Sequence, residues 1–431
     1  MSAPAVPSFR RLLVFESVAR TENVSRAAVE IHVSQPAVTQ AIARLEQEVG
    51  APLFRRRNTG CYLTEAGEIL GRRTARLFAQ LDEALTELGI GVARLGPSGL
   101  RSVERNVSQP QMRALLAIAE HGSFAAAARA LAMSEASIHR AARELERILR
   151  RPLFYRTAHG LMATKAAAEF ARRVRLAGQE LERAVEEIEA SQGRNRGRIG
   201  LGLLPLAGAF FVARALKDLG EAYPDVRVEV IDGSFDFLIE RLRSGAIDSI
   251  IGPVRGLDSK LGVVETVLFD DPYALVVRRG HPLTRKRRIS PQDLLAYDWV
   301  APPPDVPRHA VYGSLFAGLD RMPRSTLQTS SPNLTRAILT ETDCITLLSR
   351  HDSRAEEEMG FLTVLPFAVP HPARQVQVTT RSDWLPTPVQ ARFLRALHEQ
   401  AGRVGDRLRT DRQRPRPAAF AAGLGPAAGR R

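Results

Sequence analysis

Short polar side chains gather near the start of one expected helix, where they could read DNA bases. Gln35, Thr39 and Gln40 carry hydrogen-bond donors and acceptors of the kind that match base edges in a major groove. Pro36 and Arg44 lie in the same stretch, and polar side chains at such a position also contact backbone phosphates. These five residues are the first candidates for contact with DNA.

A helix beginning after Ser34 would position these side chains. Ser34 is a favourable N-cap, and proline is tolerated in the first helical turn because its missing N–H is not needed there. A shorter helix over residues 24–31 precedes it, and only His32 and Val33 separate the two, which is the spacing of a helix-turn-helix. Apolar residues recurring at helical spacing predict the buried face, namely Ala37, Val38, Ala41, Ile42, Leu45 and Val49.

Three adjacent arginines follow the expected helix. Arg55, Arg56 and Arg57 precede a Gly-containing turn, so a two-stranded wing would carry them toward phosphates or a minor groove. The alternative is a solvated charge run on an ordinary helical hairpin. The helix pair immediately upstream favours the wing.

These residues resemble the LysR family of bacterial transcriptional regulators, without a gap over about 60 residues. Asn23 and Val24 depart from the family, which usually has Ser-Phe after a glycine here, so the second helix is expected to sit a little differently. The resemblance implies sequence-specific DNA binding and transcription regulation. It rests on Phe15, Ala19, Ser25, Ala27, Ala28, Val33, Ser34, Gln35, Pro36, Ala37, Val38, Ile42, Leu45, Glu46, Gly50, Pro52, Leu53, Phe54, Arg56, Leu63, Thr64, Ala66 and Gly67.

The composition agrees with a basic, folded, multidomain protein. The chain has 431 residues and a net charge of +14, so two to four domains and anionic partners are expected. Cys61 and Cys344 lie far apart without metal or redox spacing, and we expect no metal, no cofactor and a reduced cytoplasm. No apolar run reaches the length of a membrane span, and the N-terminus lacks a signal-peptide core.

A long proline-free helix is expected over residues 65–94, after a first winged helix-turn-helix domain at residues 8–64. The positions that step by four and three predict a dimerisation seam, made of Leu70, Thr74, Leu77, Leu81, Ala84 and Leu88. The alternative is an amphipathic helix that lies on its own domain. In the LysR family the matching helix pairs two DNA-binding domains.

After a flexible joint at residues 95–107, the pattern repeats at an offset of 100 residues. The repeat predicts a second, divergent winged helix-turn-helix at residues 108–164 and a second linker helix at residues 165–192. Most LysR regulators have only one such module. The matched positions include Ala127, Ala128, Ser134, Leu145, Glu146, Pro152, Leu153, Phe154, Arg156, Gly160 and Thr164, and the second seam is Phe170, Val174, Ala177, Leu181, Ala184 and Ile188.

The second copy preserves the residues that maintain the fold better than the residues expected to contact DNA bases. Glu135 replaces Gln35, and a carboxylate there would meet phosphate repulsion unless it accepts from a cytosine amine. His139, Arg140 and Arg156 are the candidate DNA contacts of this copy. The two copies are therefore not expected to read the same bases.

Two arrangements of the seams remain open. The matched register of the seams and the flexible joint between them lead us to the hypothesis that they pair within one chain, which would make a single-chain counterpart of the family's dimeric DNA-binding unit. Equivalent seams could instead pair between chains and present four helix-turn-helix units per dimer. A homo-oligomer, either a dimer or a tetramer, is expected in both cases.

Strands and helices alternate over residues 193–402, which predicts two α/β lobes, each built on a parallel sheet and joined by crossings near residues 253–272 and 360–375. This portion resembles the LysR effector-binding domain, which is similar to type 2 periplasmic binding proteins. The fold class is thus two winged helix-turn-helix modules with linker helices, followed by a two-lobed α/β domain. Residues 403–431 are predicted to be a disordered basic tail.

The family resemblance implies a small-molecule effector between the lobes, where free N–H groups at helix starts attract anions. The effector is sugar-related or an organic acid, and the apolar residues at the first loop weigh against a strongly hydrated carboxylate. Ordinary capping and surface pairing are the alternatives for the serines and the arginine. The candidates are Leu204, Pro205, Leu206, Arg308 in a proline-rich loop, Ser330, Ser331 and Thr380 near the second crossing.

An enzyme is not expected. His281, the pair Asp270 and Asp271, and the pair His351 and Asp352 could be assembled into a site, but no nucleophile elbow, phosphate-binding loop or metal spacing accompanies them. A free-standing solute-binding protein would lack the helix-turn-helix. The sequence predicts a cytoplasmic regulator whose partners are promoter DNA, a small effector and, as a further candidate, RNA polymerase.

Overall fold

The computed structural model describes residues 8–90, 107–157, 160–194, 196–205, 207–258, 261–324 and 327–413. Of the predicted joint at residues 95–107, all but Val107 lies outside these residues. The first module consists of α1 (Phe9–Thr21), α2 (Val24–Glu30), α3 (Gln35–Val49), β1 (Phe54–Arg57), β2 (Gly60–Leu63) and α4 (Glu65–Glu87). The second repeats this order in α6 (Gln109–His121), α7 (Phe124–Ala130), α8 (Glu135–Leu149), β3 (Phe154–Thr157), β4 (Gly160–Ala163) and α9 (Lys165–Ser191).

Equivalent hydrogen bonds support both modules at the predicted offset. The Glu46 carboxylate accepts the backbone N–H of Leu53 at 2.8 Å, and Glu146 accepts that of Leu153 at the same distance. Because a buried N–H without a partner is costly, the turn into each wing requires this carboxylate. The matching Leu-Glu and Pro-Leu-Phe sequences therefore preserve a fold contact.

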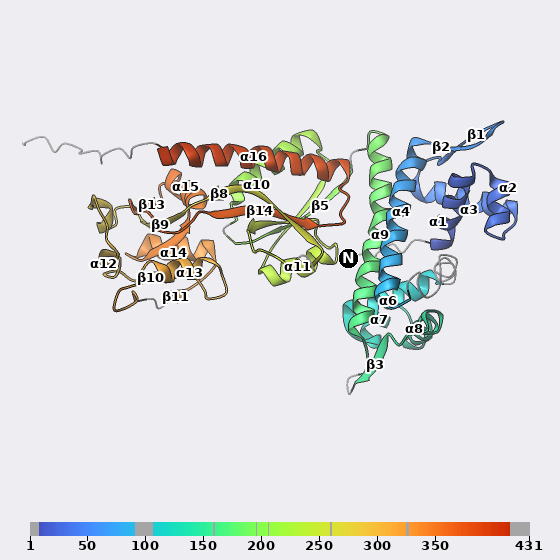
Figure 1. Ribbon diagram of the computed structural model, residues 1–431, viewed down its shortest axis with the longest axis horizontal. Coiled ribbons are helices and arrows are strands. Elements are labelled where there is room, and N and C mark those ends of the chain that lie inside the picture. Colours follow the sequence, from blue (N-terminus) through green and yellow to red (C-terminus); the bar gives the residue numbers. More distant parts are fainter. Residues whose placement is uncertain are drawn as a thin grey trace, which may run out of the picture.

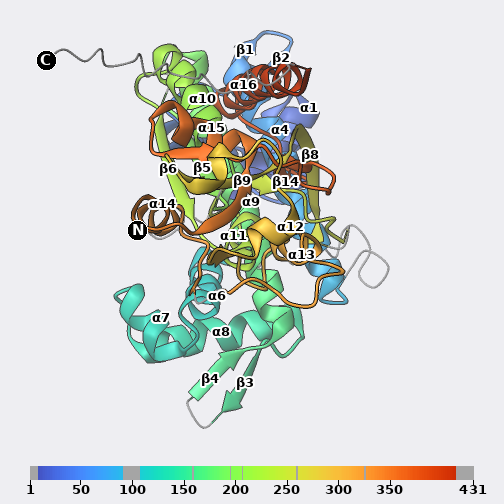
Figure 2. The ribbon, with the colours of Figure 1, turned by 90° about the vertical axis from the view of Figure 1, so that its left-hand side faces the viewer.

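Helices α4 and α9 lie side by side, and the two three-helix units lie at opposite ends of the pair (Figures 1 and 2). They run antiparallel, since Arg73 near the start of α4 contacts Glu187 near the end of α9, whereas Arg173 contacts Glu87. All predicted seam positions are buried except Leu181, which is partly buried. Helix α4 is shorter than predicted because it ends at Glu87.

Two five-stranded sheets form the effector region (Figure 1). The first has the order β6 (Arg227–Asp232), β5 (Arg198–Leu203), β7 (Ser249–Pro253), β14 (Arg374–Arg381), β8 (Val263–Asp271). The second has the order β11 (Leu327–Gln328), β10 (Trp299–Ala301), β12 (Ile345–Ser349), β9 (Tyr273–Arg278), β13 (Leu362–Val364). Helices accompany them as α10 (Ala209–Ala222), α11 (Phe235–Arg243), η2 (Pro282–Arg285), α12 (Pro291–Leu294), α13 (Arg308–Ser314), α14 (Pro332–Glu341), α15 (Arg350–Glu358) and α16 (Pro388–Gln413).

The chain crosses between the sheets at Pro272 and again between β13 and β14, close to the predicted crossings. The strand predicted over residues 268–277 is two strands, because Pro272 has no N–H for a sheet ladder. The prediction of parallel sheets holds only in part. Strands β5, β6 and β7 are parallel, whereas β14 pairs antiparallel with β7 and β8.

The predicted disordered tail is wrong over residues 403–413. Helix α16 continues to Gln413 and lies along the effector region (Figure 1). Val404 and Leu408, four residues apart on one helix face, are buried in the first lobe. Their packing explains why the helix continues here, which composition alone did not predict. Residues 414–431 lie outside the described part of the chain.

Candidate DNA-binding and effector sites

Helix α3 presents the predicted reading residues to solvent. Its buried face is Val38, Ile42, Leu45 and Val49, whereas Ala37, which was predicted to face inward, is exposed. The apolar stripe is thus narrower than predicted, because the helix packs on one side only. The five candidates from Gln35 to Arg44 are all exposed on this helix: Gln35, Pro36, Thr39, Gln40 and Arg44.

The predicted wing is present beside α3. Strands β1 and β2 pair antiparallel with Arg57 opposite Gly60, and Arg55, Arg56 and Arg57 are exposed. The N–H of Cys61 donates to the Glu22 carbonyl at 2.8 Å, which fixes the wing on the end of α1. A Cβ at residue 60 would lie 3.0 Å from that carbonyl oxygen, so the close approach favours glycine.

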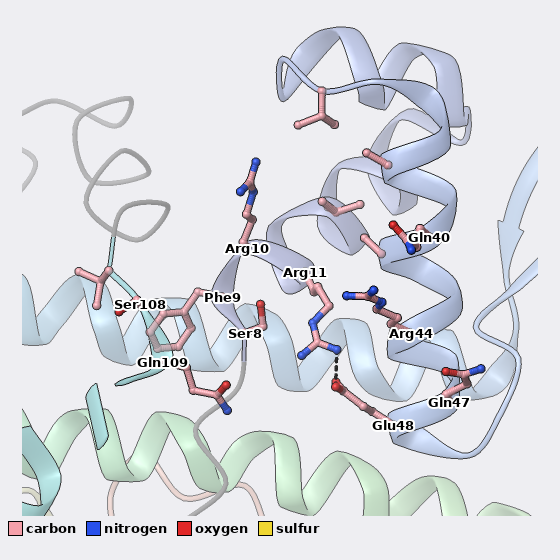
Figure 3. Close-up of a pocket in the computed structure, with 15 residues that line it drawn as sticks. Ser8, Phe9, Arg10, Arg11, Gln40, Arg44, Gln47, Glu48, Ser108 and Gln109 are labelled. Carbon is pink, nitrogen blue, oxygen red and sulfur yellow. Dashed lines mark hydrogen bonds and ion pairs between the residues drawn. The ribbon is translucent and has the colours of Figure 1, made fainter. Parts of the chain in front are cut away.

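A groove of about 1060 Å³ runs between α1, α3 and the start of α6 (Figure 3). Arg10, Gln40, Arg44 and Gln47 line it. Arg11 also lines it and pairs with Glu48. Arg10 and Gln47 were not among the sequence candidates, because their position beside the second module depends on the tertiary arrangement.

The second copy presents a different surface on α8. The ring of His139 is half-buried and stacks on Phe124 with centroids 4.4 Å apart, and its Nε2 lies 3.7 Å from the Glu135 carboxylate. Arg140 is exposed on the same helix. The side chain of Arg156 lies outside the described part, although its backbone belongs to β3.

Two further arginines of α8 are paired within the helix. Arg143 contacts Glu146 at 2.8 Å and Arg147 contacts Glu144 at 3.0 Å. Ion pairs whose arginines are exposed in this way contribute little to stability, but each carboxylate offsets part of the positive field near a phosphate. The turn between the two helices is the same as in the first copy: the N–H of Met133 donates to the Ala128 carbonyl at 2.9 Å, as that of Val33 does to the Ala28 carbonyl at 3.0 Å.

The effector candidates do not all lie together. Leu204 is buried beside Gly252 and Pro205 is exposed, while Leu206 lies outside the described residues. Ser331 caps α14 through its hydroxyl, and Ser330 is half-buried beside it.

Two effector predictions need correction. Arg308 is the first residue of α13 and does not lie in a loop. Thr380 pairs with Ser249 and Val264 near the C-terminal end of β14. The second crossing enters β14 at its other end, at Arg374, so Thr380 lies about six residues along the strand from the crossing.

A charged cluster marks the crossings between the lobes. Arg374 contacts Asp271 at 2.9 Å and Asp352 at 3.2 Å. Burial opposes charge on Arg374, but the two carboxylates outweigh it and raise the pKa of the guanidinium. The backbone N–H of His351 also donates to Asp271 at 3.0 Å. Neither Arg374 nor its neighbour Tyr273 could be selected from the sequence alone.

Arg308 approaches this cluster, and within the described part of the chain its guanidinium makes one hydrogen bond. Burial lowers the pKa of its guanidinium to about 10, with the charge of Arg374 as the second cause. The side chain donates to the Thr329 carbonyl at 3.3 Å. Burial also raises the pKa of the neighbouring Tyr273 hydroxyl. A guanidinium has five N–H donors, so this side chain can still bind an anion while it remains charged at neutral pH.

A second charged cluster joins the helix pair to the effector region. Arg73 lies between Glu180 at 2.7 Å and Glu187, and it donates to the Leu385 carbonyl at 3.0 Å. Arg183 of α9 contacts Asp248 of the first lobe at 3.3 Å. These contacts fix the first lobe against both long helices.

Comparison with known protein families decides the identity. The LysR substrate binding domain matches residues 192–402. The bacterial regulatory helix-turn-helix protein, lysR family, matches twice, over residues 9–68 and 110–168. The chain belongs to the LysR family. It is a LysR-type transcriptional regulator with a helix-turn-helix DNA-binding region and a substrate-binding effector domain; proteins of this family bind DNA and small effectors and act as oligomers.

Relatives agree with the family assignment. The HTH-type transcriptional regulator GalR of Pseudomonas putida (strain KT2440) is 29% identical over 395 residues, covering 91% of this chain and 97% of that protein. GbpR of Rhizobium radiobacter, also an HTH-type transcriptional regulator, is 32% identical over 239 residues and covers 54% and 78%.

The structure of ArgP from Mycobacterium tuberculosis shares the fold. It superposes with a TM-score of 0.51 at 19% identity, covering 68% of this chain and 97% of that one. The difference in coverage reflects the greater length of this LysR regulator.

The family identity excludes the enzyme alternative, and the geometry agrees with that exclusion. Asp271 is buried whereas Asp270 is exposed and bonds to Gln375, so the two carboxylates do not form a pair. His281 is buried and its ring accepts the Leu283 N–H, which caps η2. Among the described residues no group of acidic, histidine or cysteine side chains could hold a metal ion. No helix in the same residues is long and apolar enough to cross a membrane.

Proposed function

We propose that one chain of this regulator supplies a complete DNA-binding unit with two winged helix-turn-helix modules. The observation that carries the proposal is the burial of both seams against each other in one chain, with α3 and α8 at opposite ends of the pair (Figure 1). The proposed units are the modules at residues 8–64 and 108–164, the linker helices that follow them, and the effector domain at residues 193–402. An assembly of two chains would then carry four helix-turn-helix units.

The first copy is proposed to read sequence. Its Gln35, Thr39 and Gln40 are exposed on one helix, and amide and hydroxyl groups can both donate to and accept from base edges. Arg44 and the three wing arginines would contact phosphates and fix the register of the helix.

The second copy is proposed to add phosphate contacts and orientation more than base readout. The stack on Phe124 holds His139 against the module, and Glu135 at the start of α8 opposes approach to phosphate. Arg140 and the wing residue Arg156 would supply the remaining contacts. The binding site on DNA would then be asymmetric, with one half specified more strongly than the other.

The effector is proposed to carry a carboxylate, which favours an organic acid or an acidic sugar derivative over a neutral sugar. The support is the partly buried, charged guanidinium of Arg308, which makes one hydrogen bond among the described residues and has further N–H donors beside the crossings. Charge-assisted bonds to such a group are strong when water is excluded. Leu204, Pro205, Leu206, Ser330 and Ser331 would complete the cleft, whereas Thr380 is not assigned to it.

The signal is proposed to pass through the Arg73 cluster. Ligand binding shifts the relative populations of lobe arrangements, and the first lobe contacts both long helices through Arg73 and Arg183. A shift at this contact would change the spacing of the two modules and the bend imposed on DNA. The regulator would act on promoter DNA in the cytoplasm, with RNA polymerase as a further partner.

The experiment is genome-wide mapping of bound sites for the wild type and two double variants, Gln35→Ala with Thr39→Ala and His139→Ala with Arg140→Ala. We expect the first pair to abolish site-specific binding and the second to weaken occupancy at the same sites. If each pair removes a different half of the motif, both helices read bases. If neither pair changes the bound sites, the assignment of the reading surface is wrong.

A further inference from the structure

A small cavity lies where α10, α15 and α16 meet, on the joint between the two lobes. Its volume is about 190 Å³. Helices α10 and α16 pack in the first lobe, whereas α15 follows β12 of the second sheet. None of the residues proposed for the effector cleft lines this cavity, so it is a separate place on the molecule.

The walls of the cavity combine apolar surface with cationic groups. Phe210 and Met359 line it and are 45% and 49% exposed, although large apolar side chains of a stable protein generally lie buried. Val404 and Leu408 of α16 also line it. A molecule that covered the two exposed side chains would remove apolar area from water.

Three guanidinium groups converge at the rim. Arg354 holds the Glu358 carboxylate at 2.9 Å, and this hydrogen bond is the largest cause of the lowered pKa of Glu358. The charges of Arg214 and Arg407 lower it further. One carboxylate thus faces three positive groups that line the same cavity, which leaves a local excess of positive charge for an anion.

A histidine that lines the cavity also carries a buried polar atom. The Nε2 atom of His351 is shielded from solvent and has no hydrogen-bond partner in the described part of the chain. The ring lies 5.7 Å from that of Phe269 and 6.0 Å from that of Phe211, and burial lowers the pKa of the imidazole. A buried polar atom without a partner is costly, so a ligand atom or a water held by the ligand would satisfy it.

We propose that this cavity is a second small-molecule site, selective for a compact organic anion with one carboxylate and an apolar body. Its volume is below the range of about 300–1,000 Å³ typical for drug-sized ligands, which limits the occupant to a single ring or a short chain. The carboxylate contacts Arg214 and Arg407, and the apolar body packs on Phe210 and Met359. Because the walls come from both lobes, an occupant fixes their relative angle.

The test uses benzoate as the probe, with benzamide as its neutral counterpart, in calorimetric titrations of the full-length protein. We expect measurable binding of benzoate and at least about tenfold weaker binding of benzamide, since removing a charge-assisted hydrogen bond has about that effect. Arg407→Gln should weaken benzoate by a similar factor. Met359→Trp should block it by filling the cavity.

The matched control is Arg403→Gln, because Arg403 is exposed on the same helix and does not line the cavity. It should leave benzoate binding unchanged. A second control, Arg308→Gln, separates this cavity from the effector cleft. Benzoate binding that is abolished in Arg308→Gln and kept in Arg407→Gln would overturn the proposal, as would the absence of binding heat at millimolar benzoate. This proposal does not depend on which module reads DNA.

Discussion

The two helix-turn-helix modules share their internal contacts and differ on the surface they present. Glu46 and Glu146 make the same hydrogen bond at the same distance. The equivalent of the exposed Thr39 is His139, whose ring is stacked on Phe124. Packing and backbone hydrogen bonding therefore constrain both copies equally. The exposed faces of α3 and α8 take no part in these contacts, and there the two copies differ.

A similar contrast separates two arginines at the same position of the repeat. Arg73 is 1% exposed between Glu180 and Glu187 and reaches the effector domain, whereas Arg173 is 18% exposed and pairs with Glu83 and Glu87. The helix pair is nearly symmetric, but the single effector domain covers its two halves unequally. Arginines at equivalent positions of the repeat are therefore expected to contribute differently to the stability of the fold.

The largest predicted effect follows from this asymmetry. Arg73→Met should lower the free energy of unfolding by about 3–5 kcal/mol, because it removes the buried guanidinium that pairs with two buried carboxylates and leaves them only the longer contacts to Arg72, Arg76 and Arg183. Arg173→Met should change it by less than about 1 kcal/mol, since its partners are exposed. Urea denaturation of both variants measures the difference. Equal decreases in the free energy of unfolding would mean that the effector domain does not bury one half of the helix pair more than the other.

A pH effect should distinguish α9 from α4. Burial raises the pKa of Glu186 to about 7, so the folded state disfavours its charged form. The penalty is absent below the unfolded pKa of about 4.3 and complete above about 7. Glu186→Gln should therefore stabilise the protein by up to about 3 kcal/mol at pH 8 and hardly at all at pH 4.

The control for that measurement is Thr86→Ala, at the equivalent position of α4, where no group titrates. Its change in unfolding free energy should be the same at both pH values. A stabilisation by Glu186→Gln that does not increase with pH would contradict the assigned burial of this carboxyl group.

The wings should differ in their contribution to salt dependence. Replacing Arg55, Arg56 and Arg57 with alanine should reduce the slope of log affinity against log salt by about 0.9 for each phosphate that is no longer neutralised. Arg156→Ala in the second wing should reduce it by about 0.9 at most. Fluorescence anisotropy on one bound site over a salt series gives both slopes. A larger change from Arg156→Ala would reverse the proposed order of the copies.

The smallest predicted effect concerns the stacked histidine. His139→Thr, which gives the second copy the residue of the first, should cost about 0.5–1.5 kcal/mol of stability because the ring stack on Phe124 is removed. The reverse change, Thr39→His, should give no such gain because Val24 occupies the position of Phe124. Thermal unfolding of the two variants compares them, and a gain from Thr39→His would show that the ring stack is not the cause.

The sequence predicted the duplicated modules and the periodic apolar faces of the helices. The offset of 100 residues located both modules, and the spacing of Leu70, Leu77 and Leu81 located the seam, because these patterns follow from local geometry. It did not predict the contacts between distant segments. Arg374 meets Asp271 only through the crossing strands, and the exposure of Ala37 depends on how α3 packs. Composition misjudged residues 403–413, where Val404 and Leu408 are buried among arginines.

The pairing of α4 with α9 inside one chain has a consequence for how the protein responds to dilution. A regulator whose modules pair between chains loses its DNA-binding unit when its concentration falls below the dissociation constant of that pair. Covalent linkage makes the pairing intramolecular, with an effective concentration that can reach the millimolar range for short connections. The two modules of this regulator would therefore remain together at a few copies per cell, whether or not the chains themselves associate.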